Sequence, residues 1–111
     1  MSELTRKEEQ ILLAIHNLQE DAYLITIQDE IRRYTGKTYA VGTIYAPLNR
    51  LDINGYVEAY SDRNRNFTSK KPIKFYRLTR KGYAALEELQ GMQRVMWAGF
   101  SAPRDESAGG E

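Results

Sequence analysis

The sequence predicts a mostly helical α+β fold, a winged helix-turn-helix with a C-terminal dimerisation helix. Apolar residues recur at helical spacing in three segments before residue 52, and two short strand-like segments flank a long polar loop after residue 55. A last helical pattern begins near residue 80. Three helices, a hairpin and a final helix in this order are typical of a winged helix, and we expect residues 1–81 to form that unit.

The composition bounds the class of protein. A chain of 111 residues with 41% hydrophobic residues and no cysteine predicts one domain with a modest core, without disulfides or a thiolate metal site. No apolar run approaches the roughly 18 residues of a membrane span, and no basic segment followed by an apolar one marks a signal peptide. We therefore expect a cytoplasmic protein with no membrane contact and no cofactor.

The charge is distributed unevenly along the chain. The net charge is only +1, but residues 61–81 hold eight basic side chains and one acidic one, which gives this segment +7. The segments before and after it each carry −3. Positive charge concentrated on one hairpin favours a polyanionic partner such as nucleic acid, and the alternative is a solvated loop.

Two helices are predicted in the first 36 residues. Thr5 and Glu8 have the spacing of a capping box, and the apolar residues that follow recur at helical spacing up to residue 18. Thr26 is a candidate cap for a second helix, which Gly36 would end. The apolar residues 22–25 form either a short strand contact or an extended link.

A third helix is predicted from about Gly42 to Asp52. Ile44, Leu48 and Leu51 lie at i, i+4 and i+7 and are expected to face the core. The proline at position 47 is tolerated only near a helix start, so the helix must begin close to residue 42. The residues left facing outward are Thr43, Tyr45, Ala46, Asn49 and Arg50.

A hairpin is predicted after the third helix. Asn54 and Gly55 fit a turn, and strands are expected at residues 56–60 and 73–78. The long polar segment between the strands is expected to be a flexible wing tip rather than a tight turn. The basic residues predicted to meet phosphates or a minor groove are Arg63, Arg65, Lys70, Lys71 and Lys74.

The last helix is predicted to be longer than the core that it packs against. Thr79 is its expected cap, and about 18–20 residues at 1.5 Å each would extend beyond a compact core of this size. We therefore predict that residues 82–100 form a dimerisation helix and that residues 101–111, rich in small and charged residues, are disordered. The predicted interface residues are Leu86, Leu89, Met92, Met96, Trp97 and Phe100.

Two motifs resemble the PadR family of bacterial transcriptional regulators. One is Gly-Thr-Ile-Tyr at residues 42–45, followed by Leu48, Arg50 and Leu51, and the other is Tyr-Arg-Leu-Thr-x-Lys-Gly at residues 76–82. The pair at this separation is more specific than either half. The resemblance implies a homodimeric winged helix that binds operator DNA, usually as a repressor, through its third helix, with the C-terminal helix as the dimer contact.

The DNA-binding candidates lie on the predicted recognition helix and its preceding turn. By position in the resemblance, Gly42, Thr43 and Tyr45 fall on the N-terminal part of this helix. Asparagine can bind adenine and arginine guanine through two hydrogen bonds, while a tyrosine hydroxyl can donate to a phosphate. The alternative is a solvated helix face or a half-buried packing tyrosine. The candidates are Tyr39, Gly42, Thr43, Tyr45, Asn49 and Arg50.

Departures from the family pattern leave a second function open. The usual opening of the second helix is matched only at Ile27, Pro47 lies one residue later than usual, and Ala40 and Val41 stand where a serine is often found. The alternative to a DNA-binding regulator is a winged-helix module that acts through protein–protein contacts without binding DNA.

Catalysis and metal binding have no support in the sequence. His16 is the only histidine, and no nucleophile-elbow, P-loop or dinucleotide-binding motif is present, so we expect no enzyme and no metal site. Trp97 and Met96 have two interpretations. They either line a site for a small apolar effector, as the family resemblance allows, or simply pack in the dimer interface.

Overall fold

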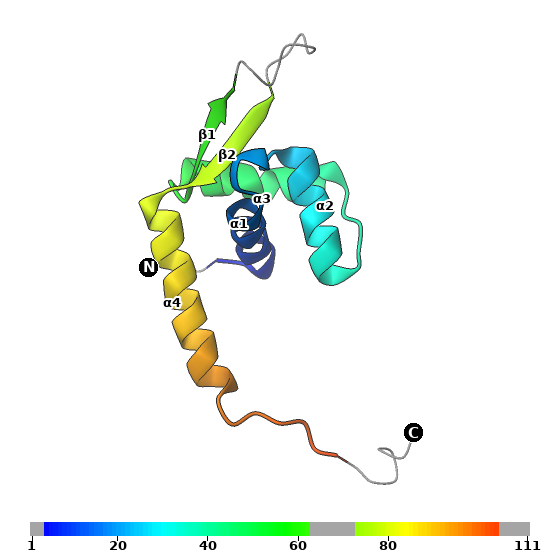
Figure 1. The fold of residues 1–111 in the computed structure, drawn as a ribbon, viewed down its shortest axis with the longest axis vertical. Coiled ribbons are helices and arrows are strands. Elements are labelled where there is room, and N and C mark those ends of the chain that lie inside the picture. The colour runs from blue at the N-terminus through cyan, green and yellow to red at the C-terminus, as the bar shows by residue number, and fades with distance from the viewer. Residues whose placement is uncertain (1–3, 63–72, 105–111) are drawn as a thin grey trace.

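The order of elements confirms the predicted mostly helical winged-helix fold, while dimerisation through the last helix stays a prediction. The structure is a computed structural model, and it describes residues 4–62 and 73–104. Figure 1 shows three helices below a hairpin and a fourth helix that descends from it. The elements are α1 (Arg6–Leu18), a 3-10 turn η1 (Gln19–Asp21), α2 (Leu24–Thr35), α3 (Val41–Ile53), β1 (Val57–Ser61), β2 (Lys74–Leu78) and α4 (Arg80–Trp97).

Local sequence signals set most helix ends. The backbone N–H of Thr5 donates to Glu8 Oε1 at 2.9 Å, and the N–H of Glu8 donates to Thr5 Oγ1 at 3.1 Å, so the predicted capping box is confirmed. Helix α2 begins two residues before its predicted cap. Thr26 works from within the first turn, where its Oγ1 accepts the N–H of Tyr23 at 2.9 Å. Gly36, with φ at 75°, ends α2 as predicted.

The wing is a two-stranded antiparallel sheet with a short third contact. Val57 lies opposite Leu78 and the register continues along the hairpin. Tyr23 forms an isolated antiparallel bridge with Phe75, and the N–H of Tyr76 donates to the carbonyl of Ala22 at 2.8 Å. Of the two alternatives for residues 22–25, strand contact is therefore right for the first two residues, whereas the last two belong to α2.

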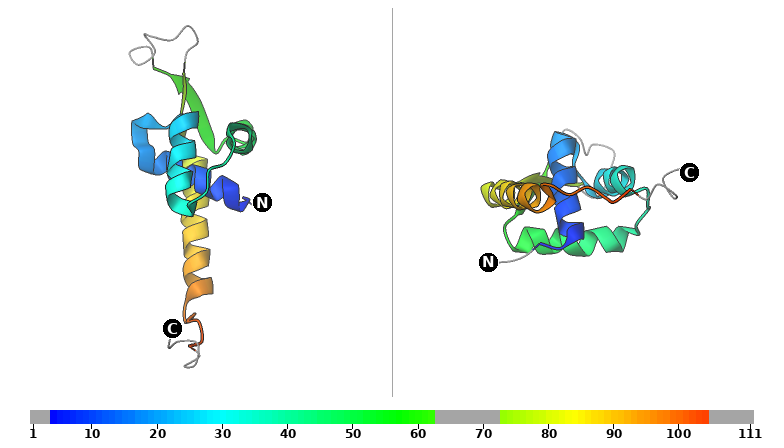
Figure 2. Two further views of the ribbon diagram at one scale, coloured as in Figure 1. Left: turned by 90° about the vertical axis from the view of Figure 1, so that its right-hand side faces the viewer. Right: turned by 90° about the horizontal axis from the view of Figure 1, so that it is seen from below.

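The core lies where α1, α2 and α3 meet the inner side of the sheet. In the left view of Figure 2 the hairpin lies above the three helices. The buried apolar residues include Ile11, Leu12, Ile15, Ile27, Ile31, Ile44, Leu48, Leu51, Val57 and Tyr76. None of the helices in residues 4–62 and 73–104 is both long and apolar enough to cross a membrane.

A tight joint fixes where α4 leaves the hairpin. Thr79 Oγ1 accepts the N–H of Gly82 at 3.1 Å and lies 2.6 Å from the carbonyl oxygen of Gly55, to which it can donate. Lys81 Nζ donates to the carbonyl of Asn54 at 2.7 Å. The second resemblance motif thus ties the start of α4 to the turn after α3, and Thr79 is confirmed as the cap.

Only the first half of α4 packs on the core. Ala85 and Leu86 lie against the core, whereas Val95 is 75% exposed. The helix has 18 residues, within the predicted range, and spans about 27 Å at 1.5 Å per residue. Its second half extends away from the other helices in both Figure 1 and Figure 2.

Candidate nucleic-acid interface

Helix α3 has a buried side and an open side. Ile44, Leu48 and Leu51 are buried as predicted, and Pro47 is buried with them. On the open side, the predicted candidates Gly42, Thr43 and Tyr45 are exposed and Asn49 is half-buried. The side turned away from the core is therefore accessible to a ligand.

The N-terminus of α3 has no side-chain cap. The cap residue is Ala40, whose carbonyl accepts the N–H groups of Thr43 at 3.0 Å and Ile44 at 3.3 Å. The N–H groups of Val41 and Gly42 precede these first helical bonds, and both residues are exposed. Such a helix end carries partial positive charge and can accept an anion such as a phosphate.

Gly42 is not required by the internal packing of the chain. A Cβ built on it meets no atom within 4 Å, and its φ is not in the positive region. Glycine within a helix costs about 0.5–1 kcal/mol relative to alanine. The internal packing thus gives no reason for glycine here, and the missing side chain leaves the backbone open to close approach by a partner.

Arg50 is engaged inside the molecule. Its Nε lies 2.8 Å from Oε2 of Glu8, whose side chain is only 7% exposed, while the arginine side chain is 53% exposed. The second oxygen of Glu8 accepts the N–H of Thr5. Arg50 thus holds α3 against α1, and base contact by this residue stays a prediction that competes with its ion pair.

The two candidate tyrosines differ in their surroundings. Tyr39 is half-buried against the core, with Lys7 Nζ 3.3 Å from its ring centroid, and its carbonyl accepts Gln28 Nε2 at 2.6 Å. Tyr45 is 43% exposed on the open side of α3, near Tyr76. Packing dominates for Tyr39, whereas Tyr45 is accessible to a phosphate.

Buried Tyr76 links α3 to the wing. Burial raises the pKa of its phenol above the ordinary value of 10.0, and Tyr45 and Asp52 on α3 add to the shift. Tyr76 is thus part of the support for the open helix face.

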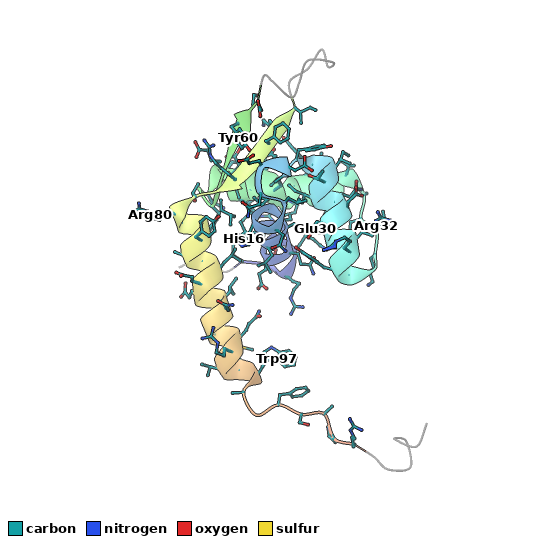
Figure 3. All side chains as sticks on the ribbon, viewed as in Figure 1. His16, Glu30, Arg32, Tyr60, Arg80 and Trp97 are labelled. Atoms are coloured by element: carbon teal, nitrogen blue, oxygen red, sulfur yellow. The ribbon has the colours of Figure 1, made fainter. Side chains whose placement is uncertain are left out.

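The described part of the wing contributes one exposed cation to the predicted set. Lys74 is exposed at the start of β2. Arg77 on the same strand lies 3.4 Å from Glu58 and 4.6 Å from the ring centroid of Tyr60, which is labelled in Figure 3. The other predicted wing residues, Arg63, Arg65, Lys70 and Lys71, lie outside the described residues.

The predicted interface residues of α4 divide into two groups. Leu86 and Leu89 are half-buried near α1. The others are exposed by half or more and are Met92, Met96, Trp97 and Phe100. Trp97 and Phe100 form an edge-to-face pair with centroids 5.1 Å apart, and Figure 3 places Trp97 near the far end of α4. The described parts of the chain thus leave about half or more of each of these side chains exposed.

The family assignment comes from comparison with known proteins. The sequence profile of the transcriptional regulator PadR-like family matches residues 11–88. The chain belongs to this family. PadR-like proteins are transcription regulators rather than enzymes, so the expectation of a DNA-binding regulator without catalytic activity is supported at the level of the family. No curated protein matches the sequence.

Solved structures of two PadR-like regulators and of RosR share the fold. A PadR-like transcription factor from Bacteroides fragilis is 26% identical, with a TM-score of 0.68 over 82% of this chain and 85% of that chain. A PadR family regulator from hypervirulent Clostridium difficile is 21% identical, with a TM-score of 0.68 over 83% and 91%. RosR from H. salinarum is 22% identical, with a TM-score of 0.70 over 89% and 82%.

The PadR-like chain also exposes residues that the sequence did not single out for the interface. On α3 these are Val41, 42% exposed, and Ile53, 74% exposed. Leu13 on α1 is exposed beside His16, and both line a hollow of about 470 Å³ against Tyr83 on α4. Leu13 lies off the apolar stripe of its helix, which is the one signal that could have indicated its exposure.

Proposed function

We propose that the protein acts as a homodimer that binds a pseudo-palindromic DNA operator and represses transcription there. The supporting observation is the open side of α3, which has an uncapped N-terminus and exposed Thr43 and Tyr45. The net charge of +7 in residues 61–81, which follow this helix in the sequence, adds to it. The helix would enter a major groove and the wing would contact the backbone beside it. Two-fold symmetry would place the half-sites one helical turn or a multiple of it apart.

The dimer contact in this proposal is the far half of α4. Its exposed apolar residues extend the groove that α4 forms with α1, and a second copy of the same helix is the simplest complementary surface. A monomer leaves this apolar area in contact with water, and burying it in a dimer would stabilise the dimer.

The first test is binding to DNA from upstream of the protein's own gene at two salt concentrations, together with the mass in solution. We expect a species of twice the chain mass whose affinity falls steeply with salt, because phosphate contacts release counterions. Replacing Arg63, Arg65, Lys70 and Lys71 by glutamine should flatten this dependence. A dimer without DNA affinity at either salt would favour the protein–protein interaction module.

Gly42→Ala separates DNA contact from folding. The added methyl meets no atom within 4 Å, so the variant should be as stable as the parent or more stable by about 0.5–1 kcal/mol. We expect weaker DNA binding nevertheless, because the methyl would separate the helix from the groove. Unchanged affinity would contradict close approach of DNA at this end of α3.

We also propose that a small apolar effector binds at Trp97 and Met96 and relieves repression. Trp97 lines a second hollow of about 470 Å³ with Leu13 and Tyr34. Titration with an apolar dye should quench the single tryptophan saturably and release the operator. Quenching that does not saturate would leave Trp97 as a packing residue.

A further inference from the structure

The most outward stripe of α3 carries no charge. At about 100° per residue, Gly42, Ala46, Asn49 and Ile53 lie opposite the buried residues and therefore point farthest from the core. Three of the four are exposed, and Asn49 is half-buried. The stripe presents a backbone edge, a methyl group, one carboxamide and one aliphatic side chain.

The basic side chain of α3 is engaged in an ion pair with α1. Arg50 is the only basic residue between Val41 and Ile53, and its guanidinium lies against the buried carboxylate of Glu8 at 2.8 Å. Releasing it would leave that carboxylate without its ion pair in a buried place. The helix therefore offers asparagine but no free arginine or lysine to the bases.

The bases of B-DNA differ in the side chains that recognise them in the major groove. Guanine is read chiefly by arginine or lysine at O6 and N7, adenine by asparagine or glutamine at N6 and N7, and thymine by apolar contact with its C5 methyl group. A stripe with one carboxamide between Ala46 and Ile53 matches adenine and thymine. It lacks the usual reader of guanine.

We propose that α3 selects A·T base pairs, with Asn49 reading an adenine and with Ala46 and Ile53 packing against thymine methyl groups. The inference rests on the proposed function, since it names the bases that the same helix reads. Arg50 then acts as a positioning residue that holds α3 on α1 instead of as a reader of guanine.

The test begins with selection of duplexes from a random library by the purified protein at low salt. In an enriched duplex, thymines are then replaced by uracil, which removes only the C5 methyl, or adenines by 7-deazaadenine, which removes only N7. We expect about a fourfold loss of affinity for each contacted methyl. Loss of N7 removes one of the two hydrogen bonds to adenine and should cost less than the roughly 5- to 150-fold that a complete bidentate contact is worth.

Matched variants assign each loss to a side chain. Ala46→Gly should bind the thymine and uracil duplexes more nearly equally, and Asn49→Ala should no longer distinguish adenine from 7-deazaadenine. Lys74→Ala, on the wing strand, should weaken binding to all duplexes alike, since a phosphate contact carries no base information. Thermal unfolding of each variant checks that α3 is intact.

The possible outcomes distinguish failure of the inferred A·T selectivity from failure of the proposed DNA-binding function. Enriched G·C pairs in the centre of each half-site, or full affinity after both base replacements, would overturn the reading of A·T pairs while leaving a DNA-binding regulator. Retention of no duplex at low salt would overturn the proposed function and the inference with it.

Discussion

At the scale of single residues, Gly82 is the glycine least tolerant of a side chain among those in the described residues. A Cβ built there would lie 2.2 Å from the carbonyl oxygen of Tyr56 and 3.3 Å from its carbonyl carbon. Backbone atoms cannot move aside as the end of a flexible side chain can. The close approach lets Thr79 and Lys81 reach the turn after α3, so the glycine is part of the joint that directs α4.

Gly82→Ala should destabilise the fold by about 1–3 kcal/mol, the usual cost of overpacking, because the helix must shift away from Tyr56. Urea unfolding measures it. The matched control is Gly91→Ala in the same helix, where the new methyl meets nothing within 4 Å and should leave stability unchanged or raise it by about 0.5–1 kcal/mol. Equal effects of the two substitutions would contradict the clash.

Tyr76 should make the free energy of unfolding depend on pH in the alkaline range. Its pKa is raised in the folded protein, chiefly by burial, so the folded state holds the phenolic proton at a pH where the unfolded chain has lost it. This contribution is complete below about pH 9 and is lost as the pH rises through about 10 and above. The free energy of unfolding should therefore fall there, and less steeply in Tyr76→Phe. Parallel curves for parent and variant between about pH 9 and 11 would remove Tyr76 as the cause.

At the scale of elements, α1 and α3 are joined by a carboxylate with two functions. One oxygen of Glu8 completes the cap of α1 and the other pairs with Arg50 on α3. The open side of α3 is presented at the angle that this contact and the apolar core impose. The helix that we propose to read DNA thus depends for its position on the N-terminal end of α1, which we do not place in the groove.

Arg50→Ala should cost about 1–3 kcal/mol, because it leaves a buried carboxylate with one charge-assisted partner fewer. The control is Arg32→Ala, which breaks an exposed pair with Asp29 at 3.6 Å and should change stability by less than about 0.5 kcal/mol. Chemical denaturation of both variants measures the difference. If Arg50→Ala were as stable as Arg32→Ala while losing base selectivity, Arg50 would be a DNA reader after all.

At the scale of the whole molecule, the first half of α4 packs on the core and its second half is exposed. Its first turns pack on the core through Gly82, Ala85 and Leu86, while Met96 and Trp97 are 66% and 60% exposed. The hollow that Trp97 lines with residues of α1 and α2 leaves more than half of both Met96 and Trp97 uncovered. Dimerisation through this end would also fix the distance between two copies of α3.

Met92→Glu combined with Met96→Glu should dissociate the proposed dimer, because two carboxylates would have to lose water on association. Operator affinity should fall far more than affinity for a single half-site, since the two α3 helices would no longer bind as a linked pair. Sedimentation and DNA titration measure these effects. Ala84→Glu, on the exposed side near the start of α4, is the control and should remain dimeric.

The sequence by itself determined the elements and their order. Capping at Thr5 and Thr79, the glycine end of α2 and the helical spacing of Ile44, Leu48 and Leu51 are local signals that act within one or two turns, and the structure confirms each. The family motifs at residues 42–45 and 76–82 were visible for the same reason. The matching family profile confirms that the chain belongs to the PadR-like family.

Only the tertiary structure decided what several of these residues contact. Arg50 and Glu8 are 42 positions apart in sequence, so their ion pair exists only once α1 and α3 pack together. The need for glycine at position 82 depends likewise on a carbonyl from another element. Helical spacing fixes which way a side chain points from its own axis, whereas the partner that it meets depends on how distant elements pack.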